Sequence, residues 1–148
     1  MKQEIQEELK QAMRERDEVK TGTLRMLLAS MLVKEKEGTS GELTDEKIQD
    51  AVIGEVKKRR EAIEAFEKGG RPEMAEREKK EMEILQKYLP EQLSSDDVRL
   101  LVAEAIKTTG ATKAQDMGKV MATLMPKVKG KADGALVSAM VKELLTAQ

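Results

Sequence analysis

In the first third of the chain, apolar residues recur at the spacing of an α-helix in two successive segments. In the first segment they return every three or four positions, and we expect this helix to end between residues 16 and 20. In the second segment the apolar stripe is denser, and it is interrupted at Gly38–Gly41. The stripe residues are Ile5, Leu9, Ala12 and Met13, followed by Leu24, Leu27, Leu28, Met31 and Leu32. The pattern predicts two amphipathic helices.

Two longer helices are predicted after this break. Thr44 is a candidate N-cap for the third helix, and Leu43 and Ile48 are placed as a hydrophobic staple around it. The apolar stripe then runs from residue 48 to 66 and stops at the glycine pair 69–70. Pro72 suits the first position of a fourth helix, whose apolar residues continue up to Pro90. The short glycine turn predicts that the third and fourth helices form a hairpin.

The basic run at residues 57–60 lies on the third predicted helix. Consecutive residues are rotated by about 100° around a helix, so the four side chains cannot form one flat basic patch. Lys57 and Lys58 point away from the apolar stripe, whereas Arg59 falls inside it. A buried arginine needs a carboxylate partner. We expect Arg59 to pair with Glu78 or Glu81 across the hairpin.

The segment Leu89–Ser94, with its proline at position 90, is the best candidate for a domain boundary. Ser94 and Asp97 approximate a capping box for a fifth helix, which continues to Gly110. A sixth helix is expected to begin at Thr112 with Gln115 and to stop at Pro126. Asp133 is placed to cap a seventh helix. The predicted organisation is an N-terminal helical domain at residues 1–92 and a smaller three-helix domain at residues 93–148.

Composition supports an all-α fold, with N-terminal helical hairpins and a small C-terminal three-helix bundle. Aromatic residues make up only 1% of the 148 residues, and β-branched residues are few beside strong helix formers. No stretch approaches the roughly 20 apolar residues of a membrane span. The N-terminal residues are charged throughout and lack the apolar core of a signal peptide. We therefore expect a cytoplasmic protein.

The chain contains neither cysteine nor histidine. This excludes thiol nucleophiles, thiolate and imidazole metal ligands, and histidine general bases. The many carboxylates alternate with lysine and arginine at the spacing of solvated helices. No phosphate-binding loop, dinucleotide fingerprint or metal-loop spacing is found. We expect no catalytic residue, no metal and no cofactor.

The most informative charged segment is residues 117–132, which contain four lysines and no acidic residue. Lys119 lies in the sixth predicted helix, and Lys127, Lys129 and Lys131 alternate between its predicted end and the seventh helix. Lysines beside a helix N-terminus suit the phosphates of a nucleic acid. These four lysines are therefore our candidate RNA-binding residues. The alternative is an ordinary solvated loop, and the residues alone do not decide between the two.

Several segments together resemble the YqeY proteins of the GatB/YqeY domain family. They are TLRMLLASM at 23–31, the run at 55–94 with KKRR and YLPEQL, and the run at 116–145 with DMGKVM and KGKADG. The same module resembles the C-terminal tail of GatB, a subunit of the glutamine-dependent Asp-tRNA/Glu-tRNA amidotransferase, and is fused to glutaminyl-tRNA synthetase in some bacteria. The resemblance implies a two-part helical fold and contact with tRNA.

By membership, carbon–nitrogen ligase activity with glutamine as amide donor is often assigned to this family. The resemblance carries the basic region of the GatB tail onto Lys119, Lys127, Lys129 and Lys131, but the amidase constellation and nucleotide-binding core are not in this chain. It implies tRNA, an aminoacyl-tRNA synthetase or an amidotransferase as partners. The main hypothesis is that the chain is a tRNA-binding accessory module. A helical protein–protein adaptor without RNA binding stays open, as does the oligomeric state.

Overall fold

A computed structural model describes residues 1–38 and 41–147 of the chain. Within these ranges it contains seven α-helices, one 3-10 turn and no strand, which confirms the all-α prediction. The chain divides into two compact units, residues 1–89 and the residues from 90 onward. The prediction that residues 1–92 and 93–148 are separate domains stays a prediction, because independent folding is a property of the isolated parts.

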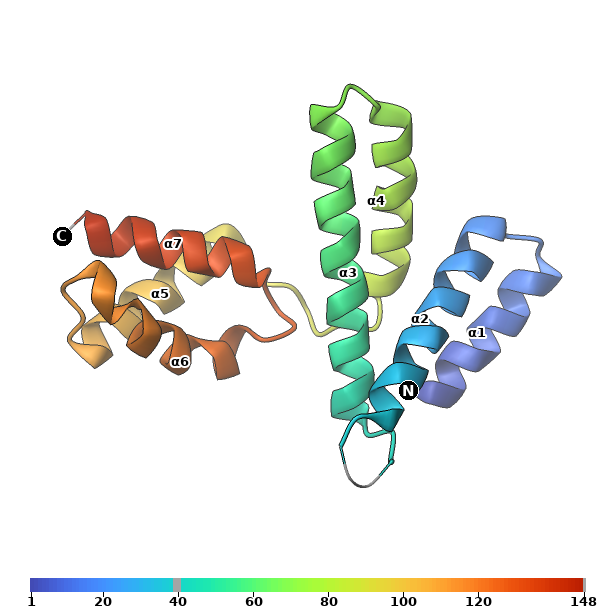
Figure 1. Ribbon diagram of the computed structural model, residues 1–148, viewed down its shortest axis with the longest axis horizontal. Coiled ribbons are helices and arrows are strands. Elements are labelled where there is room, and N and C mark those ends of the chain that lie inside the picture. Colours follow the sequence, from blue (N-terminus) through green and yellow to red (C-terminus); the bar gives the residue numbers. More distant parts are fainter. Residues whose placement is uncertain (39–40, 148) are drawn as a thin grey trace. The chain divides into compact units, whose positions relative to one another are not determined.

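The first unit consists of two helical hairpins (Figure 1). Helices α1 (Lys2–Arg14) and α2 (Glu18–Lys36) form one, and α3 (Asp45–Lys68) and α4 (Pro72–Gln86) form the other. Helix α2 packs against both α3 and α4 and so joins the hairpins. The core that they share is made by Ile5, Leu24, Leu27, Met31, Ile48, Ala51, Val52, Val56, Leu85 and Tyr88.

Most predicted helix ends of the first unit are confirmed, but α1 ends at Arg14 and not between residues 16 and 20. The Thr44 side chain accepts a hydrogen bond from the Lys47 amide, and Pro72 occupies the first turn of α4. Leu43 packs against the core that contains Ile48, as the staple requires. Helix α4 ends at Gln86, earlier than the predicted Pro90, and Tyr88 beyond its end is buried in the core. Residues 39 and 40 of the predicted break lie outside the described residues.

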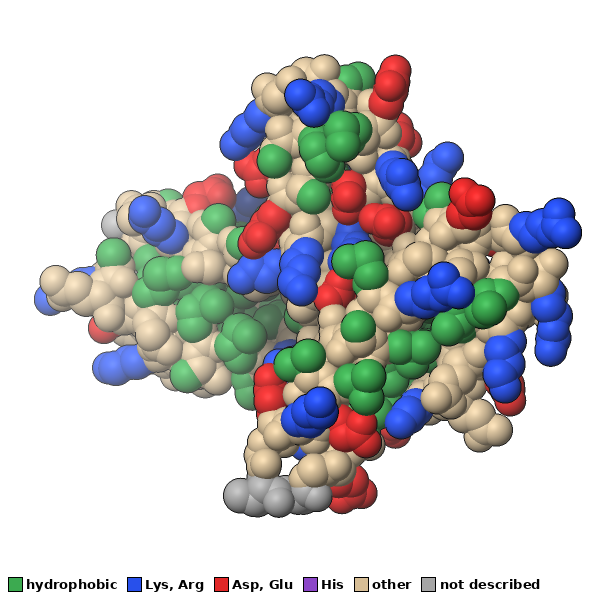
Figure 2. Space-filling view, turned by 45° about the vertical axis from the view of Figure 1, so that its right-hand side comes forward, with side chains coloured by type: hydrophobic (Ala, Val, Ile, Leu, Met, Phe, Trp, Pro, Cys, Tyr) green, Lys and Arg blue, Asp and Glu red, His purple; other side chains and the backbone are tan. Residues whose placement is uncertain are grey.

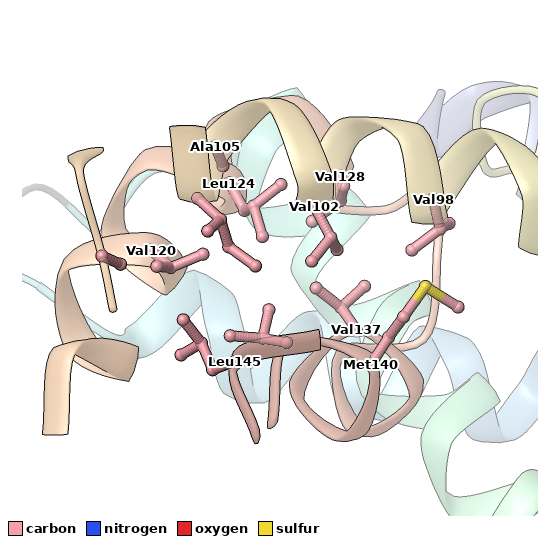
Figure 3. Packing of buried hydrophobic residues seen from close by; sticks show 12 residues of the cluster. Val98, Val102, Ala105, Val120, Leu124, Val128, Val137, Met140 and Leu145 are labelled. Atoms are coloured by element: carbon pink, nitrogen blue, oxygen red, sulfur yellow. The ribbon is translucent and has the colours of Figure 1, made fainter. Parts of the chain in front are cut away.

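The second unit is a bundle of three short helices. It contains α5 (Ser95–Thr109), the 3-10 turn η1 (Ala114–Asp116), α6 (Met117–Val128) and α7 (Gly134–Thr146). Valines and leucines from all three helices meet in its centre (Figure 3). The capping box of Ser94 and Asp97 and the Asp133 cap are both present. The predicted three-helix arrangement is thus observed.

Two predictions about α6 are wrong. Its start is not capped by Thr112: the chain makes a 3-10 turn first, and Asp116 accepts hydrogen bonds from the Thr112 and Lys113 amides. Its end is not at Pro126, since the helix continues to Val128. Proline removes one helical hydrogen bond, but Leu124 and Val128, on either side of it, are both buried in the core. Tertiary packing therefore outweighs the local cost of the proline.

Candidate nucleic-acid interface

The turn between α6 and α7, residues 129–133, is tight and well bonded. The Lys129 amide donates to the carbonyl of Met125, and the Lys131 amide donates to the carbonyl of Val128 at 2.8 Å. Between them, Gly130 is buried and has a φ of 75°. Only glycine adopts that left-handed conformation without a steric penalty. The basic turn is therefore a fixed structure in which only glycine fits easily at position 130.

The segment that precedes α5 holds this turn in place. The Gln92 side-chain amide donates to the carbonyl of Gly130 at 2.8 Å and to that of Pro90 at 2.9 Å. The Leu93 amide donates to the carbonyl of Lys131, also at 2.8 Å. Two motifs that are about 40 residues apart, YLPEQL and KGKADG, are thus parts of one structure. No local signal in the sequence links the two motifs, so this contact was not predicted.

All four predicted lysines are exposed, but they do not form a single group. Lys127 lies in the last turn of α6, and Lys129 and Lys131 follow within the turn, so these three share one end of the bundle. Lys119 is eight residues before Lys127 on the same helix, which corresponds to about 12 Å along its axis. It lies near Asp116 instead. The backbone amides of residues 112 and 113, followed by the charges of Lys119 and Lys113, lower the pKa of that carboxyl group.

The N-terminus of α7 is not available to bind a phosphate. The Asp133 carboxylate accepts a hydrogen bond from the Ala135 amide at 3.2 Å and so occupies the helix N-terminus. A carboxylate there takes the place that an anion would have. The expectation that the lysines lie between two helix ends also fails, because α6 includes Lys127. Phosphate contacts at this turn would come from lysine side chains alone.

A second set of charges lies inside the first unit, around Arg59. Arg59 is buried in α3, as its position in the apolar stripe predicted. Its Nε lies 3.8 Å from the Glu81 carboxylate of α4, which confirms one of the two expected partners. Its main partner is Glu55, to which it donates a hydrogen bond within α3. Glu55 was missed, although it lies one turn before Arg59 on the same stripe and could have been found there.

The pKa values of two carboxylates around Arg59 shift in opposite directions. Burial opposes ionisation of Glu55, but hydrogen bonds from Ser30, Lys58 and Arg59 outweigh it and lower the pKa of Glu55. Burial, together with the neighbouring Glu81, raises the pKa of Glu78. Arg59 thus pairs with Glu55 and Glu81, while the third carboxylate, Glu78, has a raised pKa. This arrangement is a structural ion pair that ties α3 to α4 and, through Ser30, to α2.

Glu8 of α1 is the centre of another ionic cluster. It accepts hydrogen bonds from the Tyr88 hydroxyl and, at 2.5 Å, from Lys87. Burial, followed by the bond to Glu8, raises the pKa of Tyr88. Glu8 and Lys87 border an open groove of about 510 Å³ between α1, α2 and α4. Because lysines and carboxylates alternate around it, the groove does not favour a ligand of either charge.

Other kinds of site find no support in the described ranges. Residues 1–38 and 41–147 contain no cluster of three or more side chains that could hold a metal ion. In the same ranges, no helix combines the length and the apolar character needed to cross a bilayer. The basic turn is therefore the candidate that chemistry and position single out.

Comparison with known proteins agrees with the resemblance seen in the sequence. The profile of the family described as "Yqey-like protein" matches residues 2–145. Three similar relatives are fungal proteins named "Altered inheritance of mitochondria protein 41, mitochondrial". Those of Eremothecium gossypii and Lachancea thermotolerans are 34% and 32% identical over 57% of this chain and 46% of their own length. That of Pyrenophora tritici-repentis is 27% identical over 97% of the chain and 80% of its own length.

These relatives correct one expectation and limit another. Their names place them in mitochondria, which overturns the prediction of a cytoplasmic protein. That prediction used the lack of a membrane span and of a secretory signal, and neither property separates the cytoplasm from the interior of an organelle. The chain spans about half the length of the first two relatives. None of the names mentions tRNA or an amidotransferase.

Proposed function

Because this chain belongs to the Yqey-like protein family, we propose that it is a tRNA-binding accessory module that contributes no chemistry of its own. Lys127, Lys129 and Lys131 contact phosphates of the RNA, and Lys119 extends the contact along α6. A partner, either an aminoacyl-tRNA synthetase or a glutamine-dependent amidotransferase, carries out the reaction. The observation that carries the proposal is the fixed turn that holds three exposed lysines at one end of the bundle.

The structure of the turn supports phosphate binding of a particular kind. The turn backbone is held by Gln92 and Leu93, so the backbone that carries Lys129 and Lys131 loses little freedom on binding. The helix N-terminus beside them is already capped by Asp133. Contacts from lysines alone are few and carry no base information. Binding should therefore be weak, independent of sequence and sensitive to salt.

The test is tRNA binding over a range of salt concentrations. We compare the wild type with a triple variant, Lys127→Ala, Lys129→Ala and Lys131→Ala. Each lost phosphate contact should lower the slope of log affinity against log salt by roughly 0.7 to 0.9, so the total change is roughly 2 to 3. The matched control replaces three exposed lysines elsewhere in the same unit: Lys107, Lys113 and Lys142.

The control changes the net charge by the same amount and should keep most of the wild-type slope. Equal losses in the two triple variants would mean that only global charge matters, and the turn would not be the site. If the wild type binds no tRNA even at low salt, RNA binding is excluded and the adaptor function takes its place.

A further inference from the structure

Helix α2 is apolar on the side that faces solvent as well as on the side that faces the core. Its buried side is part of the first unit's core, through residues such as Leu24 and Leu27. On the opposite side, Met26, Leu32 and Val33 are 52%, 54% and 62% exposed. An ordinary surface helix has charged residues there. We call the exposed residues Gly22, Met26, Ala29, Leu32 and Val33 the α2 face.

The shape of the α2 face suits another helix. Ala29 lies at its centre, three residues after Met26 and four before Val33, so a small side chain is surrounded by larger ones. Such a notch can take a ridge of side chains from a second helix. Between residues 22 and 36, the exposed positions of α2 carry only two charges, Arg25 and Lys36, and both are basic.

A pocket of about 170 Å³ lies along one edge of this surface. Leu28, Met31 and Leu32 of α2 line it together with Leu43, and the polar residues Lys2, Gln6 and Glu35 complete the lining. Leu32 belongs both to the pocket and to the α2 face, so the two are continuous. A helix lying on the face could place one apolar side chain in the pocket, where burial contributes most to affinity.

We propose that the α2 face is the docking site for an amphipathic helix of a partner protein, whose apolar stripe is flanked by aspartate or glutamate. Figure 2 shows the hydrophobic side chains gathered in a band over the α1–α2 hairpin, with lysine and arginine side chains along it. Arg25 and Lys36 lie among the apolar residues of the face, and together with Lys2 at the pocket they outnumber Glu35, so the surface favours an acidic partner. The notch at Ala29 and the side-chain pocket fit a helix better than the smooth surface of a membrane. This site is in the first unit and does not depend on RNA binding.

The probe is a labelled helical peptide with leucines at heptad core positions and glutamates beside them, titrated with the full chain. A second peptide has lysines in place of the glutamates. The acidic peptide should bind the wild type, and the basic peptide should bind at least roughly tenfold more weakly. The variant Met26→Gln with Val33→Gln should also lose roughly tenfold in affinity for the acidic peptide.

The matched control replaces two exposed apolar residues outside the face, Met74→Gln with Leu100→Gln, and should bind as the wild type does. Equal losses in the two double variants, or no binding of the acidic peptide, would overturn the proposal. Two further measurements identify a different occupant. Binding of phosphatidylserine vesicles but not of the acidic peptide would assign the face to a membrane. Self-association abolished by the Met26 and Val33 changes would assign it to a second copy.

Discussion

Arg59 and Glu55 are two opposite charges that are almost fully removed from solvent, each with 4% of its side chain exposed. Removing a charge from water costs several kcal/mol, and the ion pair recovers this only if the hydrogen bonds are complete. The Glu55 carboxylate accepts two further hydrogen bonds, from Ser30 and Lys58. The Arg59 Nε has an ion pair with Glu81 but no hydrogen bond within the described structure. We infer that this pair defines how the helices pack more than it adds stability.

Replacing one member of the pair should therefore cost much more than replacing both. Arg59→Met leaves Glu55 buried without its main partner, and we expect a loss of about 3 to 5 kcal/mol in the free energy of unfolding. The double variant Glu55→Leu with Arg59→Met should recover most of that loss. Urea unfolding followed by circular dichroism measures both, and the exposed Lys57→Met serves as control with a change within about 0.5 kcal/mol.

The pH dependence of the same variants gives a second readout. The pKa of Glu55 is lowered in the folded protein, so its contribution is complete above the ordinary value of 4.5 and is lost as the pH falls through the folded pKa. The deficit of Arg59→Met should therefore shrink in acid. A deficit that is the same at neutral pH and in acid would show that Arg59 acts through packing and not through its charge.

At the scale of the single element, the turn between α6 and α7 has one position where the backbone requires glycine. Gly130 is buried and has a φ of 75°, and its carbonyl is held by Gln92. An alanine in this conformation is strained by about 1 to 2 kcal/mol. We expect Gly130→Ala to lower the free energy of unfolding by that amount, as measured by urea titration.

Gly118 in α6 is the natural control for this change. It has an ordinary helical φ, and an added Cβ would meet no atom within 4 Å. Gly118→Ala should therefore be neutral or stabilise the protein by up to about 1 kcal/mol. If the two alanine variants have the same stability, the left-handed turn is not a constraint. The proposal that the turn holds Lys129 and Lys131 in place would then be wrong.

The elements show which sequence signals are sufficient by themselves. Caps act within one turn of helix, and for this reason Thr44, Ser94 and Asp133 could be recognised from their neighbours alone, although the same signal at Thr112 gave a wrong prediction. The predicted helix end at Pro126 is wrong because the local cost of the proline is offset by the burial of Val128 against other helices. Periodicity finds a helix, but its end depends on what the last turn packs against. That information is not local in the sequence.

Across the whole molecule, the difference between local and non-local information also decides which features of the candidate sites could be predicted from the sequence. Arg59 could be found because a helical wheel places it inside an apolar stripe. The contact between Gln92 and Gly130 could not, because no periodicity relates two residues of different turns. The four lysines were identified by charge alone, and the structure then separates Lys119 from the other three. Their role in RNA binding stays a prediction.

The two units of the chain have separate hydrophobic cores. One is built from α1 to α4 and the tyrosine that follows them, and the other from α5 to α7 and Ala111. Leu27 is completely buried in the first core, and Leu124 in the second. If each core folds as a unit, damage to one should leave the other intact. Separate unfolding of the two cores is what the predicted domain boundary between residues 92 and 93 means in physical terms.

We therefore expect Leu124→Ala and Leu27→Ala to act on different amides. Each removes a fully buried leucine and should cost about 2 to 5 kcal/mol in its own core. Native-state hydrogen exchange measures the effect at every amide. In Leu124→Ala the protected amides of α5, α6 and α7 should exchange faster, while those of α3 keep their wild-type rates, and Leu27→Ala should give the reverse. If either variant accelerates the slowest amides of both cores equally, the chain unfolds as one cooperative domain. The lysine turn and the α2 face would then share one stability, and a mutation in either core would weaken both.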